Sequence, residues 1–431
     1  MTELLIKNLD IIQQRWPILA SALRFQKIDE LDAQLVIGQN QTISVNGIQL
    51  SSRHNRIAEA ELLINNAEFN KQKVTVYGVG MGDVPSVLVD DLTIVQLEVN
   101  LLNLQLFALL LSYTDQTEWL SDDRVSIIHN PPQDSFDEMS IVIAPELILA
   151  SDDNASLRDL LALEKNRDYA NKQHAVDDPK LLQRFKENQL LLEQDLDAAV
   201  LMLNQPQIKA HVIGAGPSLE QHYSYLNAQR MLPVEKRPLL IAVDTAFKAL
   251  MSEGIIPDIV VSIESNIAKM HFPDEIPSSV KLVYFPRVPN EVLLSWPGER
   301  FNAYSKSPIY DALDRENPKL RLFTNGSVIH PAIDLAIYLQ TKEITLFGCD
   351  FSYPNNKTHA FWKDGALGPK VEDAKHWIIN GHGERVATDL NFKTYLRSLE
   401  HYIRSKPHIK FYQSSLEGAL IHGAQYKECK A

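Results

Sequence analysis

The stretch HVIGAGPSLEQ, His211–Gln221, passes from an apolar run into a glycine turn and then into a helix start. Gly214 and Gly216 permit a tight turn or a close approach of the backbone, and Pro217 suits a first helical turn. Ser218 can cap this helix, with a glutamine three residues later completing a capping box. The free amides of such a helix start favour phosphate binding. A capped turn without a ligand is the alternative.

Strand-like runs alternate with helix-length segments around this turn. The runs are AHVIGAG, LLIAVDTA, DIVVSIES, KLVYF, LRLFTNG and EITLFGCD. Such alternation predicts a mostly parallel sheet. Residues 205–431 are therefore expected to form a Rossmann-like domain.

Polar residues follow several of these strands, on the rim where open α/β sheets bind ligands. Asp244 and Glu264 share this rim with the glycine turn and could accept hydrogen bonds from a ribose or a base, although Asp244 could instead cap the next helix. The turn TNGS, Thr324–Ser327, would form a second wall of the same cleft.

The last strand of the series ends at Asp350 and leads into a loop that carries His359. A histidine in such a loop suits proton transfer near neutral pH. Two other histidines have structural interpretations, His330 as a satisfied helix residue and His382 as part of a hairpin turn, NGHGE. The glycine-containing segment 414–424 could close over the pocket.

An earlier segment, KVTVYGVGMGDVPSVLVDD, contains a second glycine turn at Gly78, Gly80 and Gly82. The strand that follows is expected to end at Glu98, where a carboxylate could receive a ribose hydroxyl. This order predicts a nucleotide-binding unit over residues 71–150. A tight turn without a ligand is the alternative, and the sequence does not decide between them.

Two further segments complete the expected organisation. Residues 1–70 begin with an amphipathic helix and continue with short strands, with a hairpin signal at Asn46-Gly47. Residues 151–204 are charged and have helical periodicity, which indicates a connector. The predicted fold class is α/β, with two Rossmann-like units of mostly parallel sheets, a small N-terminal β-containing module and a helical connector.

The composition is that of an ordinary folded protein, with 431 residues and a formal net charge of −13. This acidic balance argues against coating DNA or an anionic membrane, so no nucleic-acid partner is expected. The most apolar window, residues 92–113, is interrupted by polar residues, and the N-terminus lacks a signal-peptide pattern. We therefore expect a cytoplasmic protein without a membrane span. Two cysteines without a CxxC pair, and no cluster with metal-ligand spacing, predict no essential metal.

The motifs GAGPSL, AVDTAF, PDIVVSIE, TNGS, GCDFSY with a following THA, and EGALIHG occur in this order over roughly residues 205–425. Together they resemble the central domain of the motility accessory factor family, flagellin nonulosonic-acid transferases whose core is similar to bacterial sialyltransferases. EAELLI and YGVGMGD also resemble that family's N-terminal domain. The resemblance implies a glycosyltransferase for bacterial motility. It would use a CMP-activated pseudaminic, legionaminic or sialic-type acid as donor and Ser/Thr hydroxyls of flagellin as acceptors.

The resemblance also implies roles for individual residues. GAGPS matches the donor phosphate loop, Asp244 a second nucleotide-contact motif, and TNG the turn that holds the donor, where Ser is commoner than Asn325. With the rim residues above, the expected donor-binding set is Gly214, Gly216, Pro217, Ser218, Asp244, Glu264, Thr324, Asn325, Gly326, Ser327 and Tyr353.

The catalytic residues implied by the resemblance are His359, Asp350 and His382. His359 fits the family's Thr-His pattern and is the first choice as general base, and His382 is the alternative because sialyltransferases keep a base further downstream. The glycine loop would stabilise the departing CMP phosphate while a His or Asp takes the acceptor's proton. No cofactor is required for this reaction.

Two rival functions remain open. The same superfamily includes archaeal hydroxymethyl-dihydropterin pyrophosphokinases, which would bind ATP at the loop and Mg²⁺ at Asp244 or Asp350, although no Walker lysine follows the loop here. A noncatalytic protein that binds flagellin or a nucleotide sugar is the other. The sugar, the acceptor and the oligomeric state are not fixed by the sequence.

Overall fold

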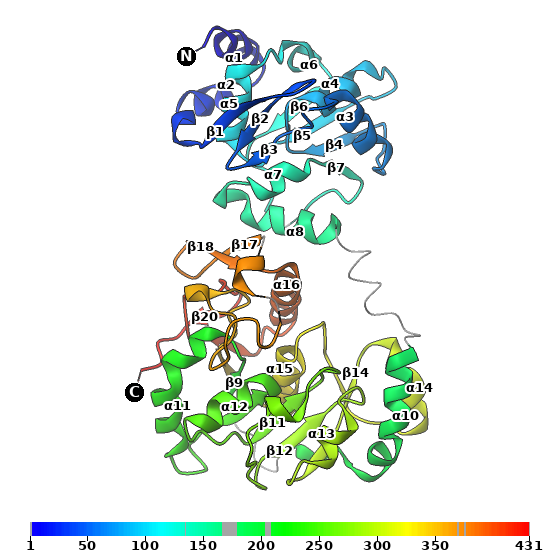
Figure 1. The fold of residues 1–431 in the computed structure, drawn as a ribbon, viewed down its shortest axis with the longest axis vertical. Coiled ribbons are helices and arrows are strands. Elements are labelled where there is room, and N and C mark those ends of the chain that lie inside the picture. The colour runs from blue at the N-terminus through cyan, green and yellow to red at the C-terminus, as the bar shows by residue number, and fades with distance from the viewer. Residues whose placement is uncertain are drawn as a thin grey trace. The chain divides into compact units, whose positions relative to one another are not determined.

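The computed structural model describes residues 2–133, 135–165, 179–202, 208–368, 370–374 and 376–430. The chain divides into two units, Met1–Arg167 and Asp168–Ala431, and each combines helices with sheets (Figure 1). The predicted α/β class is confirmed. No helix within the described ranges is long and apolar enough to cross a membrane.

Unit 1 contains a parallel sheet in the order β6-β5-β4-β7 and an antiparallel sheet in the order β1-β2-β3. The strands are β1 (Ala33–Ile37), β2 (Gln41–Val45), β3 (Ile48–Gln49), β4 (Val74–Tyr77), β5 (Leu97–Asn100), β6 (Val125–Ile128) and β7 (Ser140–Val142). The helices are α1 (Glu3–Arg15), α2 (Pro17–Arg24), η1 (Ile28–Glu30), α3 (Arg56–Asn65), α4 (Asp83–Asp90), α5 (Leu104–Tyr113), α6 (Thr117–Ser121), α7 (Ala144–Ile148), η2 (Asp152–Asn154) and α8 (Ala155–Lys165).

The N-terminal residues and the parallel sheet of unit 1 share one hydrophobic core. Ile12 of α1, Val45 of β2 and Val76 of β4 are all fully buried in it. The Asn46-Gly47 hairpin is confirmed, because both residues adopt positive φ between β2 and β3. The module expected over residues 1–70 and the unit expected over 71–150 are therefore packed together.

The predicted strand, glycine turn and helix at β4 and α4 are confirmed. The predicted end of the next strand is wrong. β5 continues to Asn100, and Glu98 lies inside it, paired with Thr75 of β4. The Glu98 carboxylate lies 3.1 Å from the Lys73 ammonium group, so this side chain is part of a strand-surface ion pair and not a strand-end ligand residue.

Unit 2 contains a nine-stranded sheet in the order β20-β19-β16-β9-β10-β11-β12-β13-β8, with two small two-stranded sheets. Its strands are β8 (Leu196–Asp197), β9 (Lys209–Ile213), β10 (Leu239–Val243), β11 (Ile259–Ser262), β12 (Lys281–Tyr284), β13 (Arg300–Asn302), β14 (Tyr304–Ser305), β15 (Arg321–Leu322), β16 (Glu343–Phe347), β17 (His376–Ile379), β18 (Arg385–Thr388), β19 (Lys410–Gln413) and β20 (Gln425–Tyr426). Its helices are α10 (Pro179–Gln194), η3 (Ala198–Leu201), η4 (Pro217–His222), α11 (Tyr223–Arg230), α12 (Asp244–Ser252), η5 (Lys269–His271), α13 (Asn290–Leu294), η6 (Pro308–Tyr310), α14 (Asp311–Glu316), α15 (Ile329–Tyr338), η7 (Pro354–Asn356), η8 (Val371–Asp373) and α16 (Leu390–Arg404).

The pairings of the nine-stranded sheet are parallel, as the sequence predicts. The expected place of the run LRLFTNG in this sheet is wrong, because its strand β15 pairs with β14 in a separate sheet. Its central strands are almost continuously buried and apolar, the pattern of a sheet covered on both faces. Connections run outward from β9 in one direction through β10, β11 and β12, and β16 lies on the other side of β9. The strand order thus reverses between β9 and β16, and ligands of open α/β sheets bind at such a switch point.

The described helices of the expected connector fall in different units. Helix α8 belongs to unit 1 and α10 to unit 2. Residues 166–178 and 203–207 of the expected connector lie outside the described residues. The end of the connector contributes β8, the edge strand next to β13.

Candidate functional site

The glycine turn after β9 is built against the end of β16, at the switch point. The amide of Gly214 donates to the carbonyl of Phe347 at 2.7 Å, and the amide of Gly216 donates to the carbonyl of Gly348 at 2.8 Å. A Cβ atom on Gly214 would lie 2.4 Å from the Gly348 carbonyl oxygen. Gly348 itself has a φ of 58°, where a side chain is disfavoured. Glycine is thus required on both sides of this contact.

An internal carboxylate occupies the helix start that the sequence assigned to a phosphate. Asp350 is buried, and its Oδ2 accepts the Ser218 amide at 2.8 Å while its Oδ1 accepts the Ser218 hydroxyl at 2.5 Å. Pro217 is the first helical residue and Gly216 holds the N-cap position, so the distant carboxylate of Asp350 takes the place of an N-cap side chain. The predictions that Ser218 caps the helix and that its amide is free are therefore wrong, because β16 places Asp350 there.

The pKa of Asp350 lies near neutrality. Burial raises it to about 6, while the hydrogen bonds from Ser218 oppose the rise and the charge of Glu417 adds to it. The C-terminal segment lies against this residue, since the amide of Ala419 donates to the Asp350 backbone carbonyl at 2.8 Å and a Cβ atom on Gly418 would lie 2.7 Å from the Asp350 Oδ1. A cavity of about 10 Å³, enough for about one water, lies beside it, lined by residues that include Ser218, Asp350 and Ser414.

His359 is held over the glycine turn by its own loop. The amide of Ala360 donates to the carbonyl of Ala215 at 2.8 Å, and the amide of Phe361 donates to Glu220 at 2.7 Å. The Nδ1 atom of His359 is buried without a hydrogen-bond partner among the described residues. Burial lowers the pKa of His359 to about 4. The imidazole is therefore neutral at physiological pH.

His382 contacts Glu417. It lies in the turn between β17 and β18, which confirms the expected hairpin. Its Nε2 is 3.2 Å from a carboxylate oxygen of Glu417, the same residue whose charge raises the pKa of Asp350. The structure thus places Asp350 and the His359 loop at the glycine turn between β9 and β16, and His382 in the β17–β18 hairpin beside Glu417.

Asp244 is the first residue of α12 and is fully buried. Its carboxylate accepts the Ser262 hydroxyl at 2.6 Å and the Thr245 amide at 2.8 Å. Burial raises the pKa of Asp244 to about 7, and the charge of Glu264, two residues beyond β11, contributes to the rise. Asp244 and Glu264 therefore lie together on the predicted rim.

The donors of Thr324 and Asn325 are engaged within the protein. The Thr324 hydroxyl hydrogen-bonds with that of Ser305, and the Asn325 side-chain amide donates to the Ser398 hydroxyl at 2.6 Å. These two residues therefore join the turn to β14 and to α16.

The rest of this turn packs against α16. Gly326 has a φ of 82°, and a Cβ atom there would lie 2.2 Å from a ring carbon of Tyr395. The Ser327 hydroxyl accepts the amide of Ile329 at 3.4 Å. His330 is fully buried and bonded to backbone atoms through both ring nitrogens, which confirms its structural interpretation.

Tyr353 is buried, and its hydroxyl donates to Asp389 while its amide donates to the Ala387 carbonyl at 2.8 Å. Both groups fix the segment after β16 to the β17–β18 hairpin. Sequence reasoning singled out the segment 414–424 but assigned no role to Glu417 within it. It also missed Arg287, which lies three residues beyond β12. The rule that ligands bind at the carboxyl ends of parallel strands, which selected Asp244 and Glu264, applies equally to Arg287.

The N-terminal glycine turn also contains an internal carboxylate. Glu146, at the start of α7 after β7, is buried, and one of its oxygens accepts the amides of Val79 and Gly80, each at 2.6 Å. Burial raises the pKa of Glu146. These amides are the ones that would face a phosphate, so the turn fits the alternative interpretation, a strand-to-helix turn satisfied from within.

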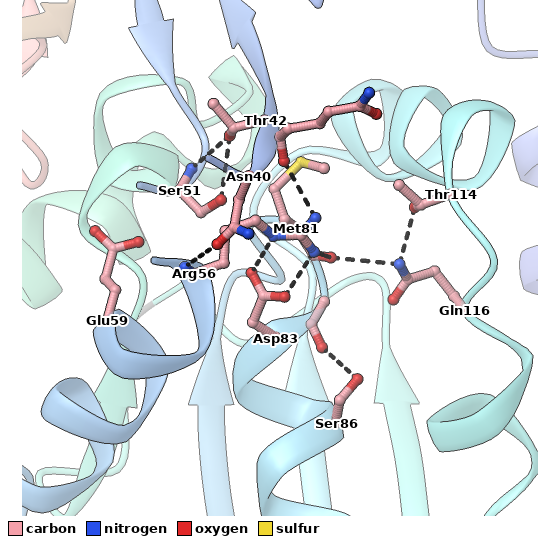
Figure 2. Close-up of polar contacts among 12 residues, drawn as sticks. Asn40, Thr42, Ser51, Arg56, Glu59, Met81, Asp83, Ser86, Thr114 and Gln116 are labelled. Carbon is pink, nitrogen blue, oxygen red and sulfur yellow. Dashed lines mark hydrogen bonds and ion pairs between the residues drawn. The ribbon is translucent and has the colours of Figure 1, made fainter. Parts of the chain in front are cut away.

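Figure 2 shows the polar contacts beside this turn. The Arg56 guanidinium binds the Asp83 carboxylate at 2.6 and 3.0 Å and the Met81 carbonyl at 3.2 Å. The Gln116 amide donates to the same carbonyl at 3.3 Å. The start of α4 is thus fixed to α3 and to the segment before α6.

Among the residues that the structure describes, no group of three or more His, Cys, Asp or Glu side chains has a geometry that could hold a metal ion. Asp244 and Asp350 each hold their hydrogen-bond donors instead.

Comparisons with known proteins return the groups that the sequence motifs suggested. A family model described as 6-hydroxymethylpterin diphosphokinase MptE-like matches residues 179–356. The 6-hydroxymethyl-7,8-dihydropterin pyrophosphokinase of Methanocaldococcus jannaschii is 27% identical over 210 residues, covering 46% of this chain and 76% of that protein. A solved MAf glycosyltransferase from Magnetospirillum magneticum AMB-1 aligns with a TM-score of 0.46 at 15% identity, over 99% of this chain and 74% of that chain. The superfamily resemblance is confirmed for residues 179–356.

Proposed function

We propose that the chain is a glycosyltransferase that moves a nonulosonic acid of the pseudaminic, legionaminic or sialic type from a CMP-activated donor to Ser/Thr hydroxyls of flagellin in the cytoplasm. The motifs of unit 2 and the arrangement of its rim support this proposal. The product would serve flagellar assembly and motility.

The observation that carries the proposal is the carboxylate of Asp350 on Ser218. A negative charge already at the helix start limits the additional charge that the glycine turn can accept. A sugar donor joined through a single phosphodiester brings less charge to this point than a triphosphate does. The loop is therefore better matched to a CMP-sugar than to ATP without a counter-ion.

The same residues supply the chemistry of transfer. The bond between the anomeric carbon and the phosphate oxygen breaks, and CMP leaves with that electron pair. The acceptor hydroxyl oxygen bonds to the anomeric carbon, and its proton passes to a general base. Asp350 suits this role because burial raises its pKa to about 6, and a base with a pKa near the working pH is most effective. The neutral imidazole of His359 can also accept a proton, but its pKa, lowered to about 4 by burial, makes it the weaker base.

A second candidate is supported by the sequence match to the archaeal pyrophosphokinase. Such an enzyme would move a pyrophosphoryl group from ATP to a pterin hydroxyl, with Mg²⁺ offsetting the charge of Asp350. The two candidates differ in the nucleotide bound and in the need for a divalent ion.

Thermal stabilisation of the purified chain by CMP, CTP, CMP-nonulosonic acids and ATP, each with and without Mg²⁺, separates these candidates because a ligand of the folded state raises apparent stability. We expect stabilisation by CMP compounds without metal, followed by mass gain of flagellin on incubation with the matching CMP-sugar. Stabilisation by ATP only, and only with Mg²⁺, would reject the transferase and favour the pyrophosphokinase.

Three variants test the catalytic assignment, Asp350→Asn, His359→Ala and His382→Ala. Loss of a general base slows transfer by roughly 10²- to 10⁴-fold, and donor binding should persist in the variant concerned. His408→Ala, at an exposed surface position, is the matched control and should transfer at the wild-type rate. Unchanged rates in all three variants would remove these residues from the mechanism.

A further inference from the structure

Arg287 lies on the rim of the nine-stranded sheet, three residues beyond the end of β12. The adjacent strand β11 is followed by Glu264, and β10 beyond it by Asp244. Carboxyl ends of parallel strands meet at one edge of a sheet, so a cation stands on the same edge as the two acidic residues and the glycine turn.

The turn that carries Arg287 is rigidly held. The amide of Val288 donates to the carbonyl of Phe285 at 3.0 Å. Asn188 of α10, which is fully buried, donates from its side-chain amide to the carbonyls of Pro286 and Val288, both at 2.8 Å. The backbone on both sides of Arg287 is thus fixed before any ligand binds.

Arg287 has no internal partner for its charge. Its Nε is buried without a hydrogen bond, and it forms no ion pair in the part of the chain that the structure describes. Other half-buried arginines of this unit are paired, such as Arg300 with Asp195 at 2.8 Å and Arg237 with Asp258 at 3.3 Å. A buried donor without an acceptor is costly, and such groups in native structures are commonly satisfied by something bound.

The surroundings of Arg287 place its charge beside the donor turn. Its charge opposes the rise that burial causes in the pKa of Tyr310 and of Tyr395, so the guanidinium lies near both rings. Tyr395 in turn packs on Gly326, and the charge of Glu264 also acts on Tyr395. Arg287 and Glu264 therefore both lie within electrostatic range of Tyr395, which packs against the Thr324–Ser327 turn.

We propose that Arg287 is an anion-binding residue of this site, whose guanidinium holds the carboxylate or phosphate oxygens of the substrate. A planar guanidinium matches both groups through two parallel hydrogen bonds. This inference rests on the proposed function for the identity of the ligand, but the unpaired donor and its place on the rim do not depend on it.

The test is titration calorimetry of the full chain with CMP, a CMP-nonulosonic acid, ATP with Mg²⁺ and inorganic pyrophosphate, for wild type, Arg287→Gln and Arg287→Lys. Loss of a charged hydrogen-bond pair should weaken binding by roughly 10- to 100-fold in Arg287→Gln. Arg287→Lys, which keeps the charge and loses the planar fork, should be intermediate. Arg237→Gln, at the opposite edge of the same sheet, is the control and should bind as wild type does, with Asp258 still paired to Arg230.

Each outcome bears on the proposal. Weaker binding of both CMP and the CMP-sugar supports a phosphate contact, and weaker binding of the CMP-sugar alone supports a carboxylate contact. If wild type does not bind CMP compounds and Arg287→Gln binds ATP or pyrophosphate more weakly than wild type does, the anion-binding role of Arg287 is supported and the transferase proposal is rejected. Equal affinities in wild type and both variants, or no binding of any of these anions by wild type, would overturn the role of Arg287. Melting temperatures of the variants within the wild-type range confirm that they are folded.

Discussion

Asp244→Asn is expected to make unit 2 more stable at neutral pH, by removing an ionisable group from its interior without changing its size. The side chain is fully buried, and its carboxyl group accepts bonds from Ser262 and Thr245. Burial, with a contribution from the charge of Glu264, raises its pKa to about 7. The amide of asparagine can still accept the Thr245 bond and does not ionise.

The magnitude follows from the two pKa values of Asp244. An unfolded aspartate has a pKa of about 3.9, so the folded state binds this proton more tightly than the unfolded state. A raised folded-state pKa means that stability falls as pH rises from about 4 to about 7. The separation of about three between the two values corresponds to about 4 kcal/mol in total. About 2 kcal/mol of this loss falls between about pH 5 and about pH 7.

The assay is denaturant unfolding of wild type and Asp244→Asn at about pH 5, 6, 7 and 8, followed by tryptophan fluorescence. The difference in unfolding free energy between variant and wild type cancels the titration of groups that both share. This difference should shift in favour of the variant by about 2 kcal/mol between about pH 5 and about pH 7. Asp274→Asn, at an exposed position, should show a difference that does not change with pH.

A pH-independent difference for Asp244→Asn would refute the reasoning, because it would mean that Asp244 ionises in the folded chain as readily as in the unfolded one. The absolute difference at one pH carries less weight, since the asparagine amide also meets the Ser262 hydroxyl.

Three other expectations concern unit stability. His422 donates to Glu400, and this hydrogen bond raises the pKa of His422. The stabilisation of the folded state by this pair is complete below about pH 6.5 and is lost as pH rises through the folded-state pKa. The difference in unfolding free energy between wild type and His422→Ala should therefore narrow from about pH 6 to 8, and a constant difference would contradict this expectation. Glu146→Ala leaves two buried amides without an acceptor and should cost about 2 to 4 kcal/mol in thermal unfolding, whereas Glu146→Gln, which keeps an acceptor, should cost less; equal losses would speak against the amide contacts. Gly214→Ala places a methyl group 2.4 Å from the carbonyl oxygen of Gly348 and should cost about 1 to 3 kcal/mol or more, so an unchanged melting temperature would show that the turn can move.

Local patterns were sufficient to predict the central strands of the nine-stranded sheet and the two glycine turns. The strands around Val212, Ile241 and Val260 read as apolar runs because helices cover both faces of the sheet. The turn at Gly214 and Gly216 could be predicted because a tight turn from a strand into a helix favours glycine. The parallel arrangement followed from the alternation of strands and helices.

Contacts between distant segments could not be predicted in the same way. Asp350 binds Ser218 across 132 positions of sequence, and the sequence does not state that β16 lies beside β9. When β16 is not known to lie beside β9, the amide of Ser218 is expected to have no hydrogen-bond acceptor within the protein. The orientation of Tyr353 toward Asp389 depends on the β17–β18 hairpin for the same reason. Site residues were therefore predicted at the right edge of the sheet, but their partners were not.

The carboxylates that occupy the two glycine turns come from equivalent positions. Glu146 follows β7, which pairs with β4, and Asp350 follows β16, which pairs with β9. Each acid is tethered to the fold, so its effective concentration at the turn exceeds that of a dissolved anion. Free phosphate therefore has to compete with a tethered carboxylate at either turn. In unit 2, a solute that gains additional contacts elsewhere on the rim can displace Asp350 or bind beside it, whereas a small anion without such contacts competes poorly with the tethered carboxylate.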